Sequence, residues 1–395
     1  MSTTQPSLPF GRPGPMRPPP LYAELRERTP VAAVTAPDGQ RAWLVTSYDA
    51  VAAVLADPRL GMAPPGTAAE GNDTLFQDGE PHLRLRRLVS KAFTPRSIAA
   101  QGPRIHRQAA ELVAALAASG PPADLVAGLA APLSIQVISD LLGVAIDERE
   151  HFHLLVEALG AAEFFTDGSE ESIAAAIRAW QDLSGYAAGL VAAKRRALGD
   201  DLLSALIRVR DTDDGRLSDE ELIGMATTLI AAGYQTARNG ISAGTVQVVT
   251  EGRLAGLADV PEQLDAVVEE VLRHLGGLIA EPFPRWAHTD LELHGVPIAA
   301  GDLVLVRLEA ANRDPRQFAD PDRFLPGRQS AGPHLTFGRG LHHCLGAALA
   351  RIELTAAFHA LAGQLPGLRL QVPPEDLEWV RGQTDAGPTA VPVTW

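Results

Sequence analysis

The stretch Phe337-Gly338-Arg339-Gly340-Leu341-His342-His343-Cys344-Leu345-Gly346 decides how the rest of the chain is interpreted. It holds the only cysteine of the protein. Gly338 and Gly340 lack a Cβ atom, so they permit tight turns and the close approach of a large flat group. A helix is predicted to begin near Cys344, and its first N–H groups and dipole would hydrogen-bond the sulfur and lower the pKa of the thiol. A haem iron with one cysteine ligand fits this pattern.

The alternative is a structural one, because a lone cysteine is more often a small buried apolar residue. The stretch resembles, however, the haem-binding loop Phe-Gly-x-Gly-x-His-x-Cys-x-Gly of the cytochrome P450 family at every fixed position. Such a motif is far more specific than a bare Gly-x-Gly. The resemblance implies haem b as the cofactor, with the thiolate of Cys344 as the axial ligand. It also implies that Phe337, Gly338, His342 and Gly346 contact the cofactor.

Length and charge narrow the class of protein. The chain has 395 residues and a net charge of −14, which argues against a nucleic-acid partner. No run of 18 apolar residues is present, so no membrane helix is expected. Residues 1–20 are rich in proline and lack an apolar signal core, which predicts an extended lead-in. A single cysteine suits a reducing compartment, and we expect a cytoplasmic monomer.

The hydrophobic pattern is mainly helical. Helices are predicted at 21–28, 48–56, 81–93, 217–249, 261–275 and 345–361 and over most of 105–198, with strands at 31–34, 42–46, 291–293, 296–298 and 303–308 and a β-like tail at 368–395. The resemblance covers Tyr22–Trp395. It implies one domain, 1–395, of mainly α structure with small β-sheets (α+β), in which a helical prism surrounds a buried haem.

The predicted helix 217–249 carries Ala232-Gly233-Tyr234-Gln235-Thr236 near its middle. A glycine inside a helix costs about 1 kcal/mol relative to alanine, so Gly233 calls for a reason. The segment resembles the family's Ala-Gly-x-Asp/Glu-Thr, where the helix opens to admit dioxygen and water. The resemblance makes Thr236 the residue that hydrogen-bonds dioxygen, and places Ala232 against the haem. Gln235 departs from the pattern, because an amide cannot deliver and regain a proton as a carboxyl group can.

Four side chains match family positions that bind the haem propionates. His82 and Arg86 are four apart on one predicted helix, in the family's His-x-x-x-Arg pattern, and would otherwise belong to a solvated basic face. Arg285 and His342 match the other two positions. Buried propionates need cationic or N–H partners, because an unpaired buried charge is costly.

A third motif is assigned a structural role. Glu270 and Arg273 match the family's Glu-x-x-Arg, and Arg323 matches the arginine of its Pro-x-Arg-Phe stretch. The resemblance implies that both arginines surround the Glu270 carboxylate.

Substrate contacts are assigned by family position alone. The resemblance implies a pocket drawn from several loops, with these contacts: Phe76, Gln77, Phe164, Phe165, Ile279, Phe283 and Asp385. Such a mixture suits a mid-sized molecule with an apolar or aromatic body and some polar groups.

The resemblance therefore implies a monooxygenase of bacterial secondary metabolism, with electrons supplied by a ferredoxin and its reductase. Arg84, Arg87, Lys91, Arg339 and Arg351 are predicted to form a basic docking patch for that acidic partner. Oxidative C–C or C–N coupling or ring closure of an aromatic substrate, such as a cyclic dipeptide, is a second candidate, suggested by Gln235 and by the aromatic residues among the predicted pocket contacts. A peroxygenase is disfavoured by Gln235 and Thr236. A non-catalytic haem sensor would not need Thr236.

Overall fold

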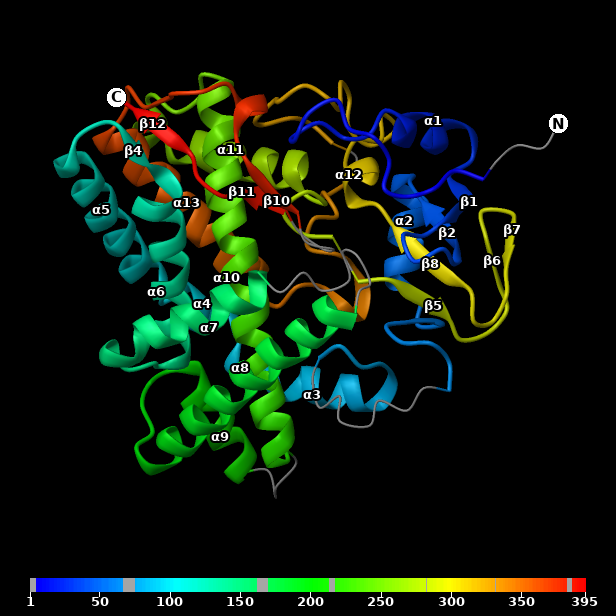
Figure 1. The fold of residues 1–395 in the computed structure, drawn as a ribbon, viewed down its shortest axis with the longest axis horizontal. Coiled ribbons are helices and arrows are strands. Elements are labelled where there is room, and N and C mark those ends of the chain that lie inside the picture. The colour runs from blue at the N-terminus through cyan, green and yellow to red at the C-terminus, as the bar shows by residue number, and fades with distance from the viewer. Residues whose placement is uncertain are drawn as a thin grey trace.

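The computed structural model describes residues 5–66, 75–161, 170–212, 217–281, 283–330, 332–381 and 386–395. Figure 1 shows a large helical part and a smaller part that carries most of the strands. The α-helices are α1 (Leu21–Arg28), α2 (Tyr48–Ala56), α3 (Gly79–Ala92), α4 (Pro95–Ala99), α5 (Gly102–Ser119), α6 (Ala131–Leu142), α7 (Arg149–Ala161), α8 (Glu170–Arg196), α9 (Leu202–Thr212), α10 (Asp219–Thr250), α11 (Pro261–Leu275), α12 (Leu308–Ala311) and α13 (Ala347–Gln364). Short π- and 3₁₀-helices lie at Val126–Ala130, Ile146–Glu148, Leu257–Asp259, Gly340–His342 and Pro374–Asp376.

The strands form small sheets, as expected for a mainly α protein. They are β1 (Val31–Thr35), β2 (Arg41–Val45), β3 (Leu60–Gly61), β4 (Ala123–Asp124), β5 (Arg285–Ala287), β6 (Leu291–Leu293), β7 (Val296–Ile298), β8 (Leu303–Val306), β9 (Arg369–Leu370), β10 (Trp379–Arg381), β11 (Ala386–Pro388) and β12 (Pro392–Thr394). The largest sheet has the order β1-β2-β8-β5-β3, in which β2 and β8 are parallel. A second sheet, β4-β12-β9, joins the chain's last strand to two distant segments.

Helix α10 is the axis of the helical part, and α6, α7, α8, α11 and α13 pack around it. A capping box begins the helix: the Ser218 hydroxyl accepts from the backbone N–H of Glu221, whose carboxylate accepts from the N–H of Ser218. Close packing requires glycine further along, because a Cβ on Gly244 would lie 2.9 Å from the ring of Phe358. Helix α10 is continuous over its whole length and forms one side of the site described below.

The predicted elements agree with most of the structure. Helices α1, α2 and α11 have the predicted bounds, whereas α3 begins two residues earlier and α13 two residues later. The predicted strand 303–308 ends at Val306, and α12 begins at Leu308.

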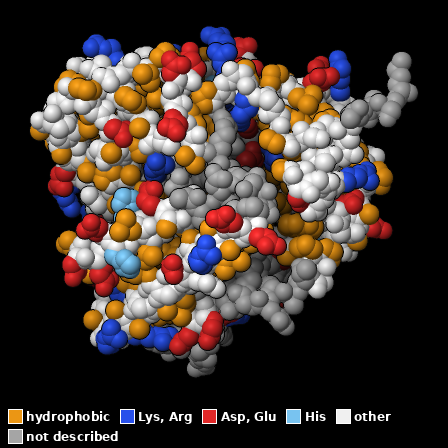
Figure 2. All heavy atoms as spheres, in the orientation of Figure 1, with side chains coloured by type: hydrophobic (Ala, Val, Ile, Leu, Met, Phe, Trp, Pro, Cys, Tyr) orange, Lys and Arg blue, Asp and Glu red, His pale blue; other side chains and the backbone are white. Residues whose placement is uncertain are grey.

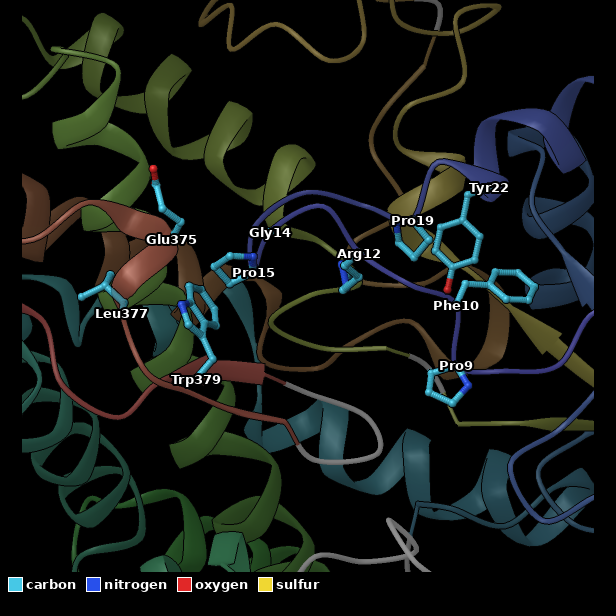
Figure 3. A pocket seen from close by; sticks show the side chains of 10 residues that line it. All are labelled: Pro9, Phe10, Arg12, Gly14, Pro15, Pro19, Tyr22, Glu375, Leu377 and Trp379. Atoms are coloured by element: carbon cyan, nitrogen blue, oxygen red, sulfur yellow. The ribbon is translucent and has the colours of Figure 1, made fainter.

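Residues 5–20, predicted to be an extended lead-in, contain a turn closed by Gly14 and Arg17 and are anchored to the rest of the chain. Ser7 forms a parallel bridge with Thr35, and Arg12 forms an ion pair with Glu309 of α12. A surface pocket of about 520 Å³ lies between this segment and the region around β10 (Figure 3). Its lining residues are Pro9, Phe10, Arg12, Gly14, Pro15, Pro19, Tyr22, Glu375, Leu377 and Trp379. None of them is a predicted site residue, so this pocket is distinct from the candidate site.

Candidate functional site

The loop around Cys344 is a tight turn closed by its own backbone. The N–H of Cys344 donates to the carbonyl of Phe337 at 2.9 Å. Gly338 and Gly340 have φ angles of +71° and +75°, in the left-handed region that favours glycine. Gly340 is also required by packing, because a Cβ there would lie 2.7 Å from the carbonyl oxygen of Leu55. The glycines that mark the motif therefore fix how the loop presents its cysteine.

The Cys344 thiol is surrounded by hydrogen-bond donors and cations. Backbone N–H groups of Gly346 and Ala347 donate to the sulfur, and the guanidinium groups of Arg86 and Arg351 lie nearby. These groups lower the pKa of the thiol, as expected, but burial among protein atoms raises it by more. The predicted net lowering is therefore wrong for the protein alone. The side chain nevertheless remains accessible to solvent.

The two histidines of the predicted propionate site lie against each other. The rings of His82 and His342 have centroids 4.1 Å apart. His82 is buried, and its two nitrogens lie 3.1 and 3.2 Å from the carbonyl oxygens of Leu75 and Leu341. Burial lowers the pKa of His82, and the positive field of His342 lowers it further. The structure thus brings helix α3 and the cysteine loop together at these rings.

The two arginines of the site are enclosed cations without a carboxylate within ion-pairing distance among the described residues. Arg285 on β5 is only 4% exposed, and its guanidinium donates to the backbone carbonyls of Phe283 and Pro284. Arg86 is half-buried and donates to the carbonyl of His343. Burial lowers the pKa of both. A ligand with two carboxylates would supply the partners that these cations lack.

Asp78 is a site residue that the motifs did not predict. It occupies the N-cap position of α3, where aspartate usually accepts from the first N–H groups of its own helix. Its side chain forms no such bond, and instead accepts from the backbone N–H of Met62 and contacts Nε2 of His342 at 3.2 Å. The only sequence signal was an Asp before a predicted helix, which suggests ordinary capping.

Together these residues fit a haem. The accessible thiol is bounded by backbone donors, and one buried and one half-buried guanidinium group lie without an ion-paired carboxylate among the described residues. Together with the histidine pair, these groups match a thiolate-bound iron porphyrin with two propionates. Phe337 and Gly346 lie on the same loop as the thiol. No group of three or more His, Cys, Asp or Glu side chains that could hold a bare metal ion occurs among the described residues.

On α10, the predicted oxygen-site residues lie side by side but are differently bonded. Ala232 is exposed, although Ile230 and Tyr234, two residues away on either side in the same helix, are buried. The Thr236 hydroxyl donates to the carbonyl of Ala232 at 2.8 Å. Gln235 is half-buried and packs against Gly160 of α7, where a Cβ would lie 3.1 Å from its side-chain oxygen. The helix is continuous here, so the opening that the resemblance implies is not seen.

The predicted structural triad needs a correction. Glu270 and Arg273 form the predicted ion pair, with Nε and Nη2 donating to the carboxylate at 2.8 Å. The second arginine is Arg328, whose Nε and Nη2 both donate to Glu270. Arg323 contributes only its backbone carbonyl, which accepts from Arg328, and its side chain is exposed near Asp320. The turn at Gly327, with a φ of +78°, directs Arg328 back to the carboxylate.

The structure describes only some of the predicted substrate contacts. The rings of Phe76 and Phe283 pack with centroids 4.7 Å apart, so this aromatic pair joins two predicted contact segments. Gln77 is half-buried next to them. Ile279 is 5% exposed and belongs to the main apolar core, which makes it a packing residue here. Phe164, Phe165 and Asp385 lie outside the described residues.

Three of the five cations predicted to form the basic docking patch have acidic neighbours, and the patch itself stays a prediction. Arg84 is paired with Glu221 at the start of α10, and Arg351 makes two bonds to Glu269 of α11. Arg87 lies 3.6 Å from Glu80. On the face shown in Figure 2, acidic and basic side chains are interspersed.

Within the described part of the chain, no helix is long and apolar enough to cross a membrane.

Comparison with known proteins agrees with this geometry. Residues 257–375 match the family model "Cytochrome P450". The chain is 40% identical to mycinamicin IV hydroxylase/epoxidase of Micromonospora griseorubida, over 95% of this chain and 94% of that protein. It is 38% identical to nocardicin C N-oxygenase of Nocardia uniformis subsp. tsuyamanensis, over 98% of each. The crystal structure of the LnmA cytochrome P450 hydroxylase, from the leinamycin biosynthetic pathway of Streptomyces atroolivaceus, superposes with a TM-score of 0.87 at 40% identity, over 99% of this chain and 100% of that one.

Proposed function

Because the chain belongs to the cytochrome P450 family, we propose that it is a haem-thiolate monooxygenase that oxidises a mid-sized secondary metabolite. The observation that carries the proposal is the accessible Cys344 thiol on a loop with all fixed positions of the family's haem motif. The whole chain, 1–395, acts as one domain in this proposal, and its single cysteine suits the cytoplasm.

Each predicted residue then has a defined task. Bound haem supplies dioxygen activation, which a cysteine thiolate promotes by donating electron density to the iron. The N–H groups of Gly346 and Ala347 hold the Cys344 sulfur as an acceptor. The propionates are bound by four side chains, those of Arg86, Arg285, His82 and His342. Asp78 holds the ring of His342 in place through its contact with Nε2.

Proton supply is assigned to Thr236 and Gln235. The Thr236 hydroxyl can turn from the carbonyl of Ala232 to a substrate or water and so move a proton one step. Gln235 has no titrating group, so its amide orders a water or a polar group of the substrate. We therefore expect the efficiency of the reaction to depend on a hydroxyl, amine or amide of the substrate.

The substrate class rests on two supports. The packed rings of Phe76 and Phe283 suit an apolar or aromatic body. The relatives are named for mycinamicin IV and nocardicin C, and this chain is likewise proposed to act on a bacterial secondary metabolite. Electrons are proposed to come from a small ferredoxin-type protein and its reductase.

The test is turnover of a metabolite panel by purified protein with a ferredoxin, its reductase and reductant. Oxygen insertion raises the product mass by one oxygen atom. A product that has lost hydrogens without gaining oxygen would instead support oxidative coupling. This second candidate is favoured because position 235 holds glutamine in place of the family's acid. A protein that lacks the long-wavelength Soret band of a thiolate ligand in its reduced carbon-monoxide complex would refute both.

A further inference from the structure

We propose that Tyr234 is a positioning residue that holds helix α7 against the central helix α10, and so keeps Gly160 of α7 behind the amide of Gln235. The proposal rests on the assignment of Gln235 to the oxygen site. It gives a task to a group of polar side chains on α7 and α10 that the reaction itself does not use.

The contact joins two helices through one buried side chain, that of Tyr234, and two partly exposed ones, those of His153 and Glu157. Tyr234 lies in the middle of α10 and is fully buried, with an exposed fraction of 0%. Its hydroxyl donates to Oε1 of Glu157 on α7. Nε2 of His153, one turn earlier on α7, lies 3.0 Å from the same hydroxyl and 3.4 Å from the Glu157 carboxylate.

The direction of each hydrogen bond follows from the groups present. An ionised carboxylate only accepts, so the single hydrogen of the Tyr234 hydroxyl points to Glu157. Nε2 of His153 must then donate to the phenol oxygen, which fixes the Nε2–H form of the ring. Burial raises the pKa of Tyr234, and His153, Tyr234 and Arg238 lower that of Glu157. Donor and acceptor therefore keep their roles at neutral pH.

The same face of α7 reaches the oxygen site one turn further on. Gly160 follows Glu157 by three residues and lies against Gln235, the neighbour of Tyr234. A Cβ at position 160 would lie 3.1 Å from Oε1 and 3.5 Å from Cδ of Gln235. Glycine weakens the end of α7, and the close approach of backbone to amide is the physical reason for it.

Helix α7 is otherwise held by its apolar face, where Phe152 and Val156 are buried in the main core, whereas Leu154 is 64% exposed on its outer side. The Tyr234 hydroxyl donates to a charged acceptor, and because the Glu157 side chain is 46% exposed, we assign this hydrogen bond the strength of an ordinary one. Removal of the Tyr234 hydroxyl should therefore let α7 separate from α10 more often. The Gln235 amide should then lose its contact with Gly160.

The experiment removes one oxygen atom, in Tyr234→Phe, and reads out α7 directly in the haem-loaded protein. Hydrogen–deuterium exchange of the α7 amides should quicken by about two- to ten-fold, the scale for an ordinary intramolecular hydrogen bond. Release of 4-phenylimidazole, a probe that binds haem iron and is followed by Soret absorbance, should quicken with it. Tyr186→Phe is the matched control, because the Tyr186 hydroxyl of α8 donates to Glu148 at 3.3 Å, and Glu148 lies in the 3₁₀-helix before α7 rather than in α7. That control should change neither rate.

A second arm tests the link to Gln235. With a plant-type ferredoxin and its reductase as surrogate donors, peroxide released per reductant consumed is measured for Tyr234→Phe, Gln235→Ala and the double variant. If Tyr234 acts by placing Gln235, the double variant should release no more peroxide than Gln235→Ala alone. Gly160→Ala should likewise raise peroxide release in the parent and not in Gln235→Ala.

Two results would overturn the inference. One is unchanged α7 exchange and probe release in Tyr234→Phe. The other is additive peroxide release in the double variant, which would make Tyr234 a packing residue with no link to the site. A parent protein that binds no haem would instead refute the proposed function, and the exchange measurement would still report on the contact between α7 and α10.

Discussion

The Cys344 thiol lies between two influences that move its pKa in opposite directions. Backbone donors and Arg86 and Arg351 favour the thiolate, and burial disfavours it. An iron cation would shift this balance, because metal coordination deprotonates a thiol outright. The residue is therefore suited to a metal ligand rather than to a free nucleophile.

Cys344→His tests the ligand. The reduced carbon-monoxide complex of the parent should show the long-wavelength Soret band, and the variant should show a histidine-type band and no oxygenation, since imidazole donates less electron density. The measurement is the absorption spectrum of each protein with equal haem content. A variant that kept the parent's band would show that another residue binds the iron.

The Glu270 carboxylate gives a prediction about stability. Glu270, Arg273 and Arg328 have side chains that are 3%, 2% and 9% exposed, whereas that of Arg323 is 69% exposed. Arg328→Ala should lower the free energy of unfolding by about 3 kcal/mol, because it leaves a buried charge with one partner fewer. Arg323→Ala should change it by less than about 0.5 kcal/mol. Urea unfolding followed by circular dichroism measures both, and equal losses would contradict the assignment.

At the residue scale, the motifs predicted the types of residue in the site better than they predicted which individual residues contact one another. The haem loop and the Glu270–Arg273 pair follow from fixed local spacing, and the structure has both. Arg328 could not be predicted, because it reaches Glu270 through the left-handed turn at Gly327, and Arg323 was the residue that matched the motif. Asp78 was missed because a capping residue and a ligand-orienting residue look alike in sequence.

Helix α10 places Thr236 beside Ala232 with its hydroxyl bonded back to the helix. Thr236→Ala should reduce product per consumed reductant by about ten-fold or more, the usual contribution of a positioned proton donor. Thr236→Ser keeps the hydroxyl and should stay close to the parent. The ratio is measured with the best substrate of the panel, and full coupling in Thr236→Ala would show that the substrate or water supplies the proton.

At the element scale, local signals predicted helices better than strands. The bounds of α1, α2 and α11 follow from apolar periodicity and from flanking Pro and Gly residues. Strand pairing depends on distant segments, so β3 and β4, each of two residues, gave no pattern of their own. Helix α12 follows β8 so closely that the apolar run 303–308 conceals the boundary.

For the molecule as a whole, the buried charges beneath the N-terminal segment predict a dependence of stability on pH. Burial raises the pKa of Glu281 to about 8, although Arg307 opposes the change. An unfolded glutamate has a pKa of about 4.3, so between these values the folded protein holds one more proton than the unfolded chain. Stability should therefore fall as pH rises through this window, by up to about 5 kcal/mol.

Glu281→Gln should remove that loss, because an amide has no proton to give up. The thermal midpoints of parent and variant should be similar at pH 5 and should diverge by pH 8, with the variant the more stable. Glu24→Gln, at an exposed position of α1, should follow the parent throughout. Parallel curves for parent and Glu281→Gln would show that Glu281 stays ionised in the folded protein.

The sheet β4-β12-β9 has a consequence for synthesis on the ribosome. Ala123 of β4 pairs with Val393 of β12, and the two strands lie together in Figure 1. Translation adds about 5–20 residues per second, so β4 waits for its partner for roughly 14–54 seconds after it has been made. Throughout that interval the nascent chain carries an unpaired strand edge, which chaperones bind and which can pair with neighbouring chains. Pairing of β4 with β12 is thus one of the last steps in the folding of the newly made chain. Slower codons near the 3′ end of its message would prolong the time for which the edge of β4 stays unpaired.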